Sequence, residues 1–198
     1  MIILTALGFA LFGYLIGSLS FSIWITRLVK GVDVRDSGSG HATATNTIRQ
    51  AGFAPGVLVL LLDLAKGFVP VWLALAYAPA VWMAPLTAGF VVLGHCWPVF
   101  ARFRGGMGLA STGGALLAAS PLAFLIAAIM LITLLLIVRH AARASVFTAV
   151  LTAPVYWLSG LRGAVVWIAL TVGVVIACRF LIDWNRTYRE LWLDRDRS

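Results

Sequence analysis

Charged residues are scarce in this chain. Asp, Glu, Lys and Arg make up 11% of its 198 residues, while 62% are hydrophobic. A soluble domain normally has about a quarter of its residues charged. The shortage excludes an ordinary soluble domain and predicts an integral membrane protein. Because lipid offers the backbone no hydrogen-bond partners, we expect an all-α polytopic protein, folded as a single domain over residues 1–198.

Acidic residues and cysteines are also few. The chain has seven acidic residues and fifteen Lys and Arg, a formal charge of +8, but it lacks the basic and aromatic platform of a nucleic-acid site. We expect this excess of basic residues to reflect cytoplasmic loops and anionic membrane lipids.

Cys96 and Cys178 lie in apolar stretches and are expected to be structural. Metal-ligand spacing and a G-x-S-x-G elbow are both missing, so we expect no metal, no cofactor and no Ser-His-Asp triad.

About seven membrane segments are expected from the apolar runs. They cover residues 2–26, 55–77, 83–100, 107–119, 121–138, 145–159 and 163–182. The fourth is too short to cross about 30 Å of hydrocarbon at about 1.5 Å per residue, so it is expected to be a half-helix or a re-entrant element.

The basic residues are concentrated in alternate loops, which places nearly all of them on one side of the membrane. Those expected on one side are Arg27, Lys30, Arg35, Arg49, Arg102, Arg104, Arg139, Arg143 and five arginines from Arg179 onward. The turns near residues 80, 120 and 161 carry only Arg162. By the positive-inside rule, the N-terminus lies outside and the C-terminus in the cytoplasm.

Residues 31–50, GVDVRDSGSGHATATNTIRQ, form a polar, glycine-rich loop. Gly38 and Gly40 let the backbone approach a ligand closely, and the Ser39 hydroxyl can donate to an oxyanion. Arg35 and Arg49 could add charge-assisted hydrogen bonds to a phosphate. The alternative is a flexible turn whose arginines are solvated among headgroups.

A second glycine-rich loop, RFRGGMG, begins at Arg102 and leads into the short fourth segment. Unpaired N–H groups at a helix start attract anions, so Gly105, Gly106 and Gly108 could hold a second anion. A helix-breaking turn or small-residue packing is the alternative.

Three further ionisable residues lie within apolar segments. Asp63 and Lys66 are three residues apart, on one helical face, and are expected to form a structural ion pair that braces the loops. His95, in GHCWP, is more simply explained as a hydrogen-bonded helix residue than as a base.

Four sequence stretches together resemble the bacterial acyl-phosphate:glycerol-3-phosphate acyltransferase family. The loop GSGHATATN resembles the family's GSGNxGATN, and LLDLAKGFVPV resembles its D-x-x-K-G stretch. VLGHCWPVFARFRGGMGLASTGG is similar to GHxxPxFxxFKGGKGVATxxG, and RHAARASVF is similar to R-Y-V-S-L-A-S-I. The resemblance covers nearly the entire chain and implies a small, seven-span membrane enzyme.

The resemblance also implies an activity and a site. Family members transfer a fatty acyl group from acyl phosphate to the 1-hydroxyl of glycerol 3-phosphate, giving lysophosphatidic acid for phospholipid synthesis. By position, Ser39 and Arg49 match the catalytic residues. The matching substrate-binding positions, together with Arg35 from the loop chemistry above, are Gly38, Gly40, Asn46, His95, Arg104, Gly105, Gly106, Gly108 and Ser145. We expect a monomer in the bacterial inner membrane, with its active face in the cytoplasm.

This chain departs from the family signatures at several positions. His41 replaces the Asn of GSGN, Thr43 stands where glycine is usual, and Met107 replaces the Lys of GGKG. The last signature, R-H-x-x-N-I-x-R-L, corresponds to RFLIDWNRT, in which Phe180 replaces His and Asp183 replaces Asn.

The leading interpretation is an acyltransferase. The alternatives are a non-catalytic relative that binds phosphorylated lipid precursors or regulates synthesis, and a small lipid transporter, although we find no internal repeat.

Overall fold

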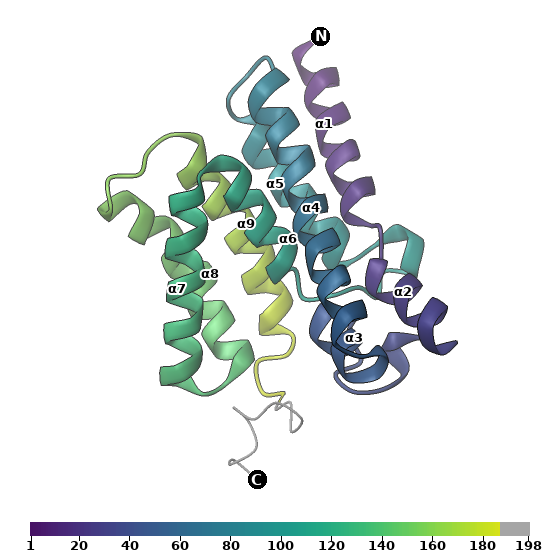
Figure 1. The fold of residues 1–198 in the computed structure, drawn as a ribbon. Helices are drawn as coiled ribbons and strands as arrows, with labels where there is room; N and C mark the ends of the chain where they lie inside the picture. Colours follow the sequence, from purple (N-terminus) through teal and green to yellow (C-terminus); the bar gives the residue numbers. More distant parts are fainter. Residues whose placement is uncertain (187–198) are drawn as a thin grey trace.

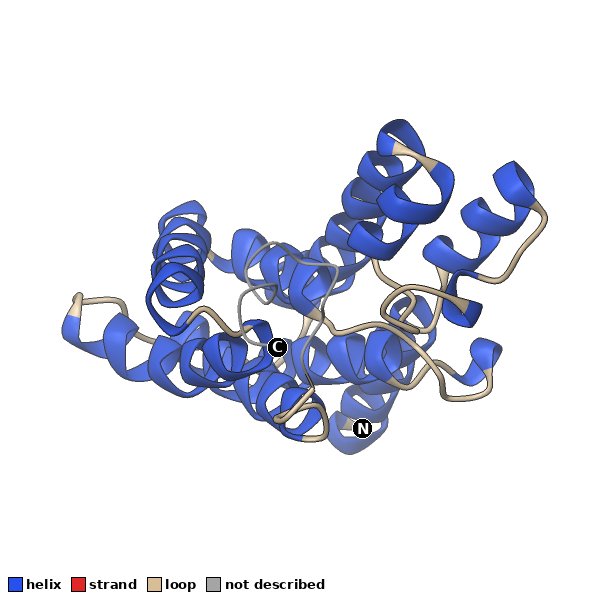
Figure 2. Ribbon diagram, turned by 90° about the horizontal axis from the view of Figure 1, so that it is seen from below, coloured by secondary structure: helices blue, strands red, loops and turns tan. Residues whose placement is uncertain are grey.

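The structure is a computed structural model, and it describes residues 1–186. Within that range it contains helices and no strands (Figure 2). The α-helices are α1 (Ile2–Gly17), α2 (Phe21–Lys30), α3 (Ala44–Ala51), α4 (Phe53–Tyr77), α5 (Met83–Cys96), α6 (Leu109–Ala119), α7 (Pro121–Val138), α8 (Ala141–Leu158) and α9 (Ala164–Leu181). Of two short 3-10 turns, η1 (Val34–Asp36) lies in the first glycine-rich loop, and η2 (Val99–Ala101) lies immediately before the second. The predicted all-helical fold is confirmed.

Five stretches of the described residues are long and apolar enough to cross a membrane. They are Ile2–Lys30, Phe53–Tyr77, Met83–Ala101, Pro121–Val138 and Ala164–Leu181. As expected, α6 is shorter, with 11 residues. The helix α8 has 18 residues but is not among the five. The protein is therefore a multi-pass membrane protein, while the number of seven crossings and their orientation stay predictions.

The first apolar run is two helices, where the sequence predicts one. The chain leaves the helical path at residues 18–20, between α1 and α2. Such a break frees a backbone carbonyl, which is costly in an apolar environment. Here the Lys66 ammonium, from the middle of α4, donates to the carbonyl of Leu19 at 2.7 Å, and the Ser18 hydroxyl donates to the carbonyl of Tyr14 at 2.8 Å. Lys66 lies 47 residues from Leu19 in the sequence, so an apolar pattern does not reveal this contact.

Helices α5 and α9 lie at the centre, and α7 lies at the edge. Within its most apolar window, the span containing α5 is 61% buried, whereas α7 is 6% buried. The main core is built from small and branched side chains such as Ala88, Val92, Ala169 and Val172. Since α7 is almost wholly apolar and exposed, its surface is suited to lipid.

Both glycine-rich loops lie at the same end of the bundle. In Figure 1, α2, α3 and the end of α7 lie at the lower end, while the turns that follow α4 and α8 lie at the upper end. The end of α9 also reaches the lower end. The tail arginines beyond residue 186 lie outside the described residues. In the described part, the basic loops predicted to share one side do share one end.

Candidate active site

Asn46 organises the first glycine-rich loop. Its side chain is fully buried at the start of α3, and its Nδ2 donates to the carbonyls of Val34 (2.7 Å), Ser37 (3.2 Å) and His41 (3.1 Å). Its Oδ1 accepts from the Ser39 backbone N–H at 3.4 Å. One amide side chain thus contacts four backbone groups and sets the path of the loop around Ser39.

The glycines on either side of Ser39 adopt left-handed backbone conformations. Gly38 has φ +61° and Gly40 has φ +69°. A residue with a Cβ is strained at such angles, so the turn that presents Ser39 requires glycine on both sides.

The two glycine-rich loops contact each other. The Ala42 N–H donates to the carbonyl of Gly105 at 3.2 Å, and the Gly106 N–H donates to the carbonyl of His95 at 3.1 Å. A Cβ on Gly106 would overlap the His95 ring, and one on Gly105 would overlap the His95 carbonyl. The absence of side chains at both positions lets the second loop pass between His95 and the first loop.

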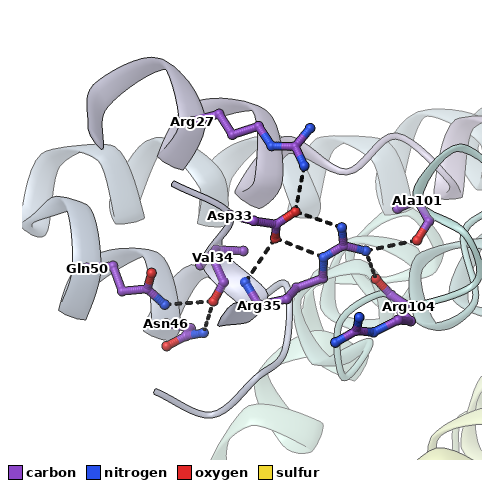
Figure 3. A network of polar contacts seen from close by, with 8 residues as sticks. All are labelled: Arg27, Asp33, Val34, Arg35, Asn46, Gln50, Ala101 and Arg104. Carbon is purple, nitrogen blue, oxygen red and sulfur yellow. Dashed lines mark hydrogen bonds and ion pairs between the residues drawn. The ribbon is translucent and has the colours of Figure 1, made fainter. Parts of the chain in front are cut away.

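Arg35 joins the loops from the other side (Figure 3). Its Nε and Nη2 bind the Asp33 carboxylate at 2.9 and 2.7 Å, and its Nη1 donates to the carbonyls of Ala101 (2.9 Å) and Arg104 (3.1 Å). Arg27 also binds Asp33, at 2.7 Å. The Arg35 guanidinium holds the pKa of Asp33 well below its usual range, so this carboxylate remains charged at neutral pH.

A cavity of about 520 Å³ lies beside the joined loops. Of the residues predicted from the sequence, those that line it are Ser39, Arg49, His95, Gly108 and Ser145. The other predicted residues do not line it: Arg35, Gly38, Gly40, Asn46, Arg104, Gly105 and Gly106. The structure therefore divides the predicted site into residues at the cavity wall and loop residues outside the wall.

The cavity is lined by polar residues of the first loop and by apolar residues of the helices. The start of α6 reaches the wall at Gly108, whose φ of +84° again favours glycine. Apolar lining residues come from α4, α6 and α7, among them Leu60, Leu64, Leu109 and Leu135. In the sequence these residues differ from other apolar residues in no recognisable way, so they could not be assigned to the site before the structure was known.

A smaller cavity of about 130 Å³ continues between α6, α7, α8 and α9. It shares Leu109, Gly113, Phe124 and Ser145 with the larger one. The hydroxyls of Thr148 and Thr152, in its wall, donate to carbonyls of their own helix at 2.8 and 2.6 Å. Their hydrogen-bonding capacity is used locally, which leaves a wall suited to an apolar chain.

The predicted Asp63–Lys66 ion pair is present and buried, with Lys66 Nζ 2.9 Å from Asp63 Oδ1. The same carboxylate oxygen lies 3.7 Å from His95 Nδ1. Asp63 and His95 both line the cavity, whereas Lys66 supports the break between α1 and α2. The pair thus links the site to the helix break, and Asp63 belongs to the cavity wall, which sequence analysis missed.

Four of the positions at which the chain departs from the family signatures also line the cavity. They are His41, Thr43, Met107 and Phe180. Asp183 lies behind them, with Oδ2 3.2 Å from His41 Nε2. Burial, followed by the positive charge of Arg179, lowers the pKa of His41 to about 4, so the imidazole is neutral at pH 7.

A family model described as Glycerol-3-phosphate acyltransferase matches residues 7–190. The chain belongs to this family. It is 41% identical over 152 residues to the glycerol-3-phosphate acyltransferase of Shouchella clausii (strain KSM-K16), covering 76% of this chain and 74% of the relative. It is 37% identical over 183 residues to that of Aquifex aeolicus (strain VF5), covering 91% of this chain and 94% of the relative.

Solved acyltransferase structures have the same fold. The crystal structure of PlsY (YgiH), an integral membrane glycerol 3-phosphate acyltransferase, in its glycerol 3-phosphate form, superposes with a TM-score of 0.80 at 36% identity, covering 91% of this chain and 90% of that chain. The lysophosphatidic acid form of PlsY gives a TM-score of 0.79 at 35% identity. The family expected from the sequence is confirmed.

Proposed function

We propose that this acyltransferase transfers a fatty acyl group from acyl phosphate to the 1-hydroxyl of glycerol 3-phosphate, giving lysophosphatidic acid. The observation that carries the proposal is a cavity lined both by polar residues, such as Ser39 and Arg49, and by apolar helix residues, which shares part of its wall with a second, mostly apolar cavity between the helices. Donor and product are amphiphiles with one anionic end and one apolar tail, and a cavity with both kinds of lining suits them.

The transfer itself needs positioning more than activation, because an acyl phosphate is already reactive. The acceptor oxygen attacks the acyl carbon, the new C–O ester bond forms, and the bond between that carbon and the phosphate oxygen breaks. Phosphate leaves with the electron pair, and the proton of the acceptor hydroxyl goes to the released phosphate or to water. Holding both anionic groups correctly in a low-dielectric site supplies much of the rate enhancement.

Individual residues have separate roles in this proposal. Ser39 and Arg49 act at the reacting groups, with Arg49 stabilising negative charge on phosphate oxygens. Gly108 presents the N-terminal N–H groups of α6 to an anion, and His95 and Ser145 complete the wall around the substrates.

The loop residues hold the site in shape. Asn46, Gly38 and Gly40 set the path of the first loop, and Gly105 and Gly106 allow the second loop to approach it. We assign Arg35, together with the Arg104 backbone carbonyl, to bracing the loops, since all three guanidinium nitrogens of Arg35 donate within the protein.

We further infer that the protein is a single-domain monomer of the bacterial inner membrane with the cavity facing the cytoplasm. The basic residues at the loop end support this orientation through the positive-inside rule. Membrane lipids, acyl phosphate and glycerol 3-phosphate are its expected partners.

Turnover by the purified protein tests the proposal. Full-length protein in lipid nanodiscs, given long-chain acyl phosphate and labelled glycerol 3-phosphate, should form labelled lysophosphatidic acid. Ser39→Ala and Arg49→Ala should each reduce kcat about 10²–10³-fold, as for loss of one preorganised charge-stabilising contact. Ser37→Ala, an exposed serine in the same loop, is the matched control and should retain the rate.

Two results would contradict the proposal. Full activity of Ser39→Ala would remove the serine from the mechanism. A wild-type protein that binds acyl phosphate without turning it over would favour a regulatory relative that binds phosphorylated lipid precursors.

A further inference from the structure

Among residues 1–186, three nitrogen donors lie close to the carboxylate of Asp183. His41 Nε2 is 3.2 Å from its Oδ2, Arg179 Nη1 is 3.5 Å from the same oxygen, and Arg186 Nη1 is 3.8 Å from Oδ1. The side chains of His41 and Asp183 are only 9% and 8% exposed. A buried carboxylate accepts hydrogen bonds and cannot donate them, so it is stable here only while donors surround it.

The contact joins two parts of the chain that are far apart in the sequence. His41 lies two residues after Ser39, whereas Asp183 lies in the turn that follows α9. The same turn makes a second contact with the serine loop, because Arg186 Nη2 donates to the carbonyl of Ser39 at 2.9 Å. Two side chains of one segment therefore hold the backbone around Ser39.

The turn after α9 is also anchored on its other side. The Trp184 ring packs edge-on against Phe147 of α8, with ring centroids 6.1 Å apart. The guanidinium carbon of Arg143 lies 5.4 Å from the centre of the same Trp184 ring. Trp184 thus attaches the segment to α8, and Asp183 connects this attached segment to the serine loop.

His41 and Asp183 are two of the departures from the family signatures, both of which have Asn. In the folded protein these two departures meet, with 3.2 Å between His41 Nε2 and Asp183 Oδ2. Two amides can share a neutral hydrogen bond, while a neutral imidazole donates a charge-assisted one to a carboxylate. With Asn at position 183 alone, one of the two acceptor oxygens would be replaced by a donor NH2 group. That NH2 group would face the N–H donors of Arg179 and Arg186, which would then share a single acceptor oxygen.

We propose that His41 and Asp183 form a positioning pair that holds the Ser39 loop against the segment after α9, and that the two residues are energetically coupled. The catalytic part of this inference rests on the proposed function. The pair holds Ser39 in place and takes no part in the transfer itself, so its loss lowers kcat more than it raises the KM for glycerol 3-phosphate.

A double-mutant cycle tests the coupling, using full-length protein in nanodiscs. His41→Asn and Asp183→Asn should each lower kcat by about tenfold, and the double variant should regain at least about fivefold over the product of the two single effects. The KM for glycerol 3-phosphate should change by less than about threefold in each variant. Asp36→Asn, which removes an exposed carboxylate from the same loop, is the control and should keep the wild-type kcat.

Hydrogen exchange of the backbone over residues 37–43 is a second measurement that needs no turnover. Asp183→Asn should accelerate exchange there, Asp36→Asn should not, and the double variant should return exchange toward the wild-type rate. A shared loss of thermal stability in every variant, without this pattern, would indicate general damage and overturn the proposal.

The outcomes separate the two proposals. An active wild-type protein whose single effects simply multiply in the double variant would refute the coupled pair and leave the proposed function intact. An inactive wild-type protein would refute the proposed function, and the exchange pattern alone would then decide whether the pair holds the loop.

Discussion

His41 illustrates, at the scale of one residue, how burial sets a charge state. Its pKa is lowered from 6.5 to about 4 by burial and by the nearby Arg179, with Arg186 acting in the same direction and Asp183 opposing them. In the unfolded chain the imidazole takes up a proton near pH 6.5, whereas in the folded protein it stays neutral down to about pH 4. Stability from this residue is therefore complete above pH 6.5 and falls as the pH drops toward 4.

This loss of stability at low pH can be tested by comparing the wild-type protein with His41→Asn. Between pH 7.5 and pH 5, the wild-type protein should lose on the order of 1–2 kcal/mol more stability than His41→Asn, because the variant has no group at this position to protonate on unfolding. Thermal unfolding of both proteins in the same detergent at the two pH values measures the difference. An equal loss in both proteins would show that His41 titrates normally in the folded state.

Glycines determine the packing at the scale of helices. Helices α4 and α6 approach so closely that a Cβ on Gly67 would overlap the carbonyl of Ser111, and one on Gly114 would overlap the carbonyl of Leu64. The same arrangement joins α1 to α5, where Gly17 lies against Val91 and Gly94 lies against Tyr14. Small residues let helix backbones come close in a membrane, which gives van der Waals contact in the absence of a hydrophobic driving force.

Gly114→Ala should therefore force α4 and α6 apart. We expect a loss of about 1–3 kcal/mol in stability and a lower kcat, because both helices contribute residues to the cavity wall. Gly8→Ala is the matched control, since nothing lies within 4 Å of a Cβ at this exposed position of α1. Thermal midpoints and initial rates of the two variants provide the test. A Gly114→Ala protein as stable as Gly8→Ala would mean that the helices are packed more loosely than the structure shows.

For the molecule as a whole, charge is separated along the bundle axis. The two glycine-rich loops and the end of α9 lie at one end, and the turns after α4 and α8 lie at the other (Figure 1). By the positive-inside rule, this separation predicts one orientation, with the loop end in the cytoplasm. In that proposed orientation the cavity would be open to soluble phosphates and to amphiphiles of the inner leaflet.

Cysteine labelling tests this orientation. In a Cys178→Ala background, Lys30→Cys at the loop end should react with a membrane-impermeant maleimide only in inside-out vesicles, and Ser159→Cys at the opposite end only in right-side-out vesicles. Both positions are exposed, and the remaining Cys96 is buried. The reverse pattern would place the cavity outside the cytoplasm and contradict the proposed localisation.

Much of the fold could be predicted from the sequence, because transfer into lipid depends mainly on each segment's own composition. The segment 121–138 was predicted with the bounds of α7, and α6 was predicted as a short element. The helix break at residues 18–20 and the helix α3 were not predicted. Both are held by partners outside their own apolar pattern, Lys66 for the break and the Asn46 loop contacts for α3.

The sequence by itself determined the class of protein, the family and the two loops of the candidate site. Only the tertiary structure decided what each charged side chain does there. Arg35 and Arg49 are equivalent as sequence features, yet one binds Asp33 and backbone carbonyls while the other lines the cavity. The contact between His41 and Asp183 likewise exists only after folding. The hydropathy of a segment depends on its own residues, so it can be read from the sequence. The partner of a buried charge depends instead on which distant segments pack together.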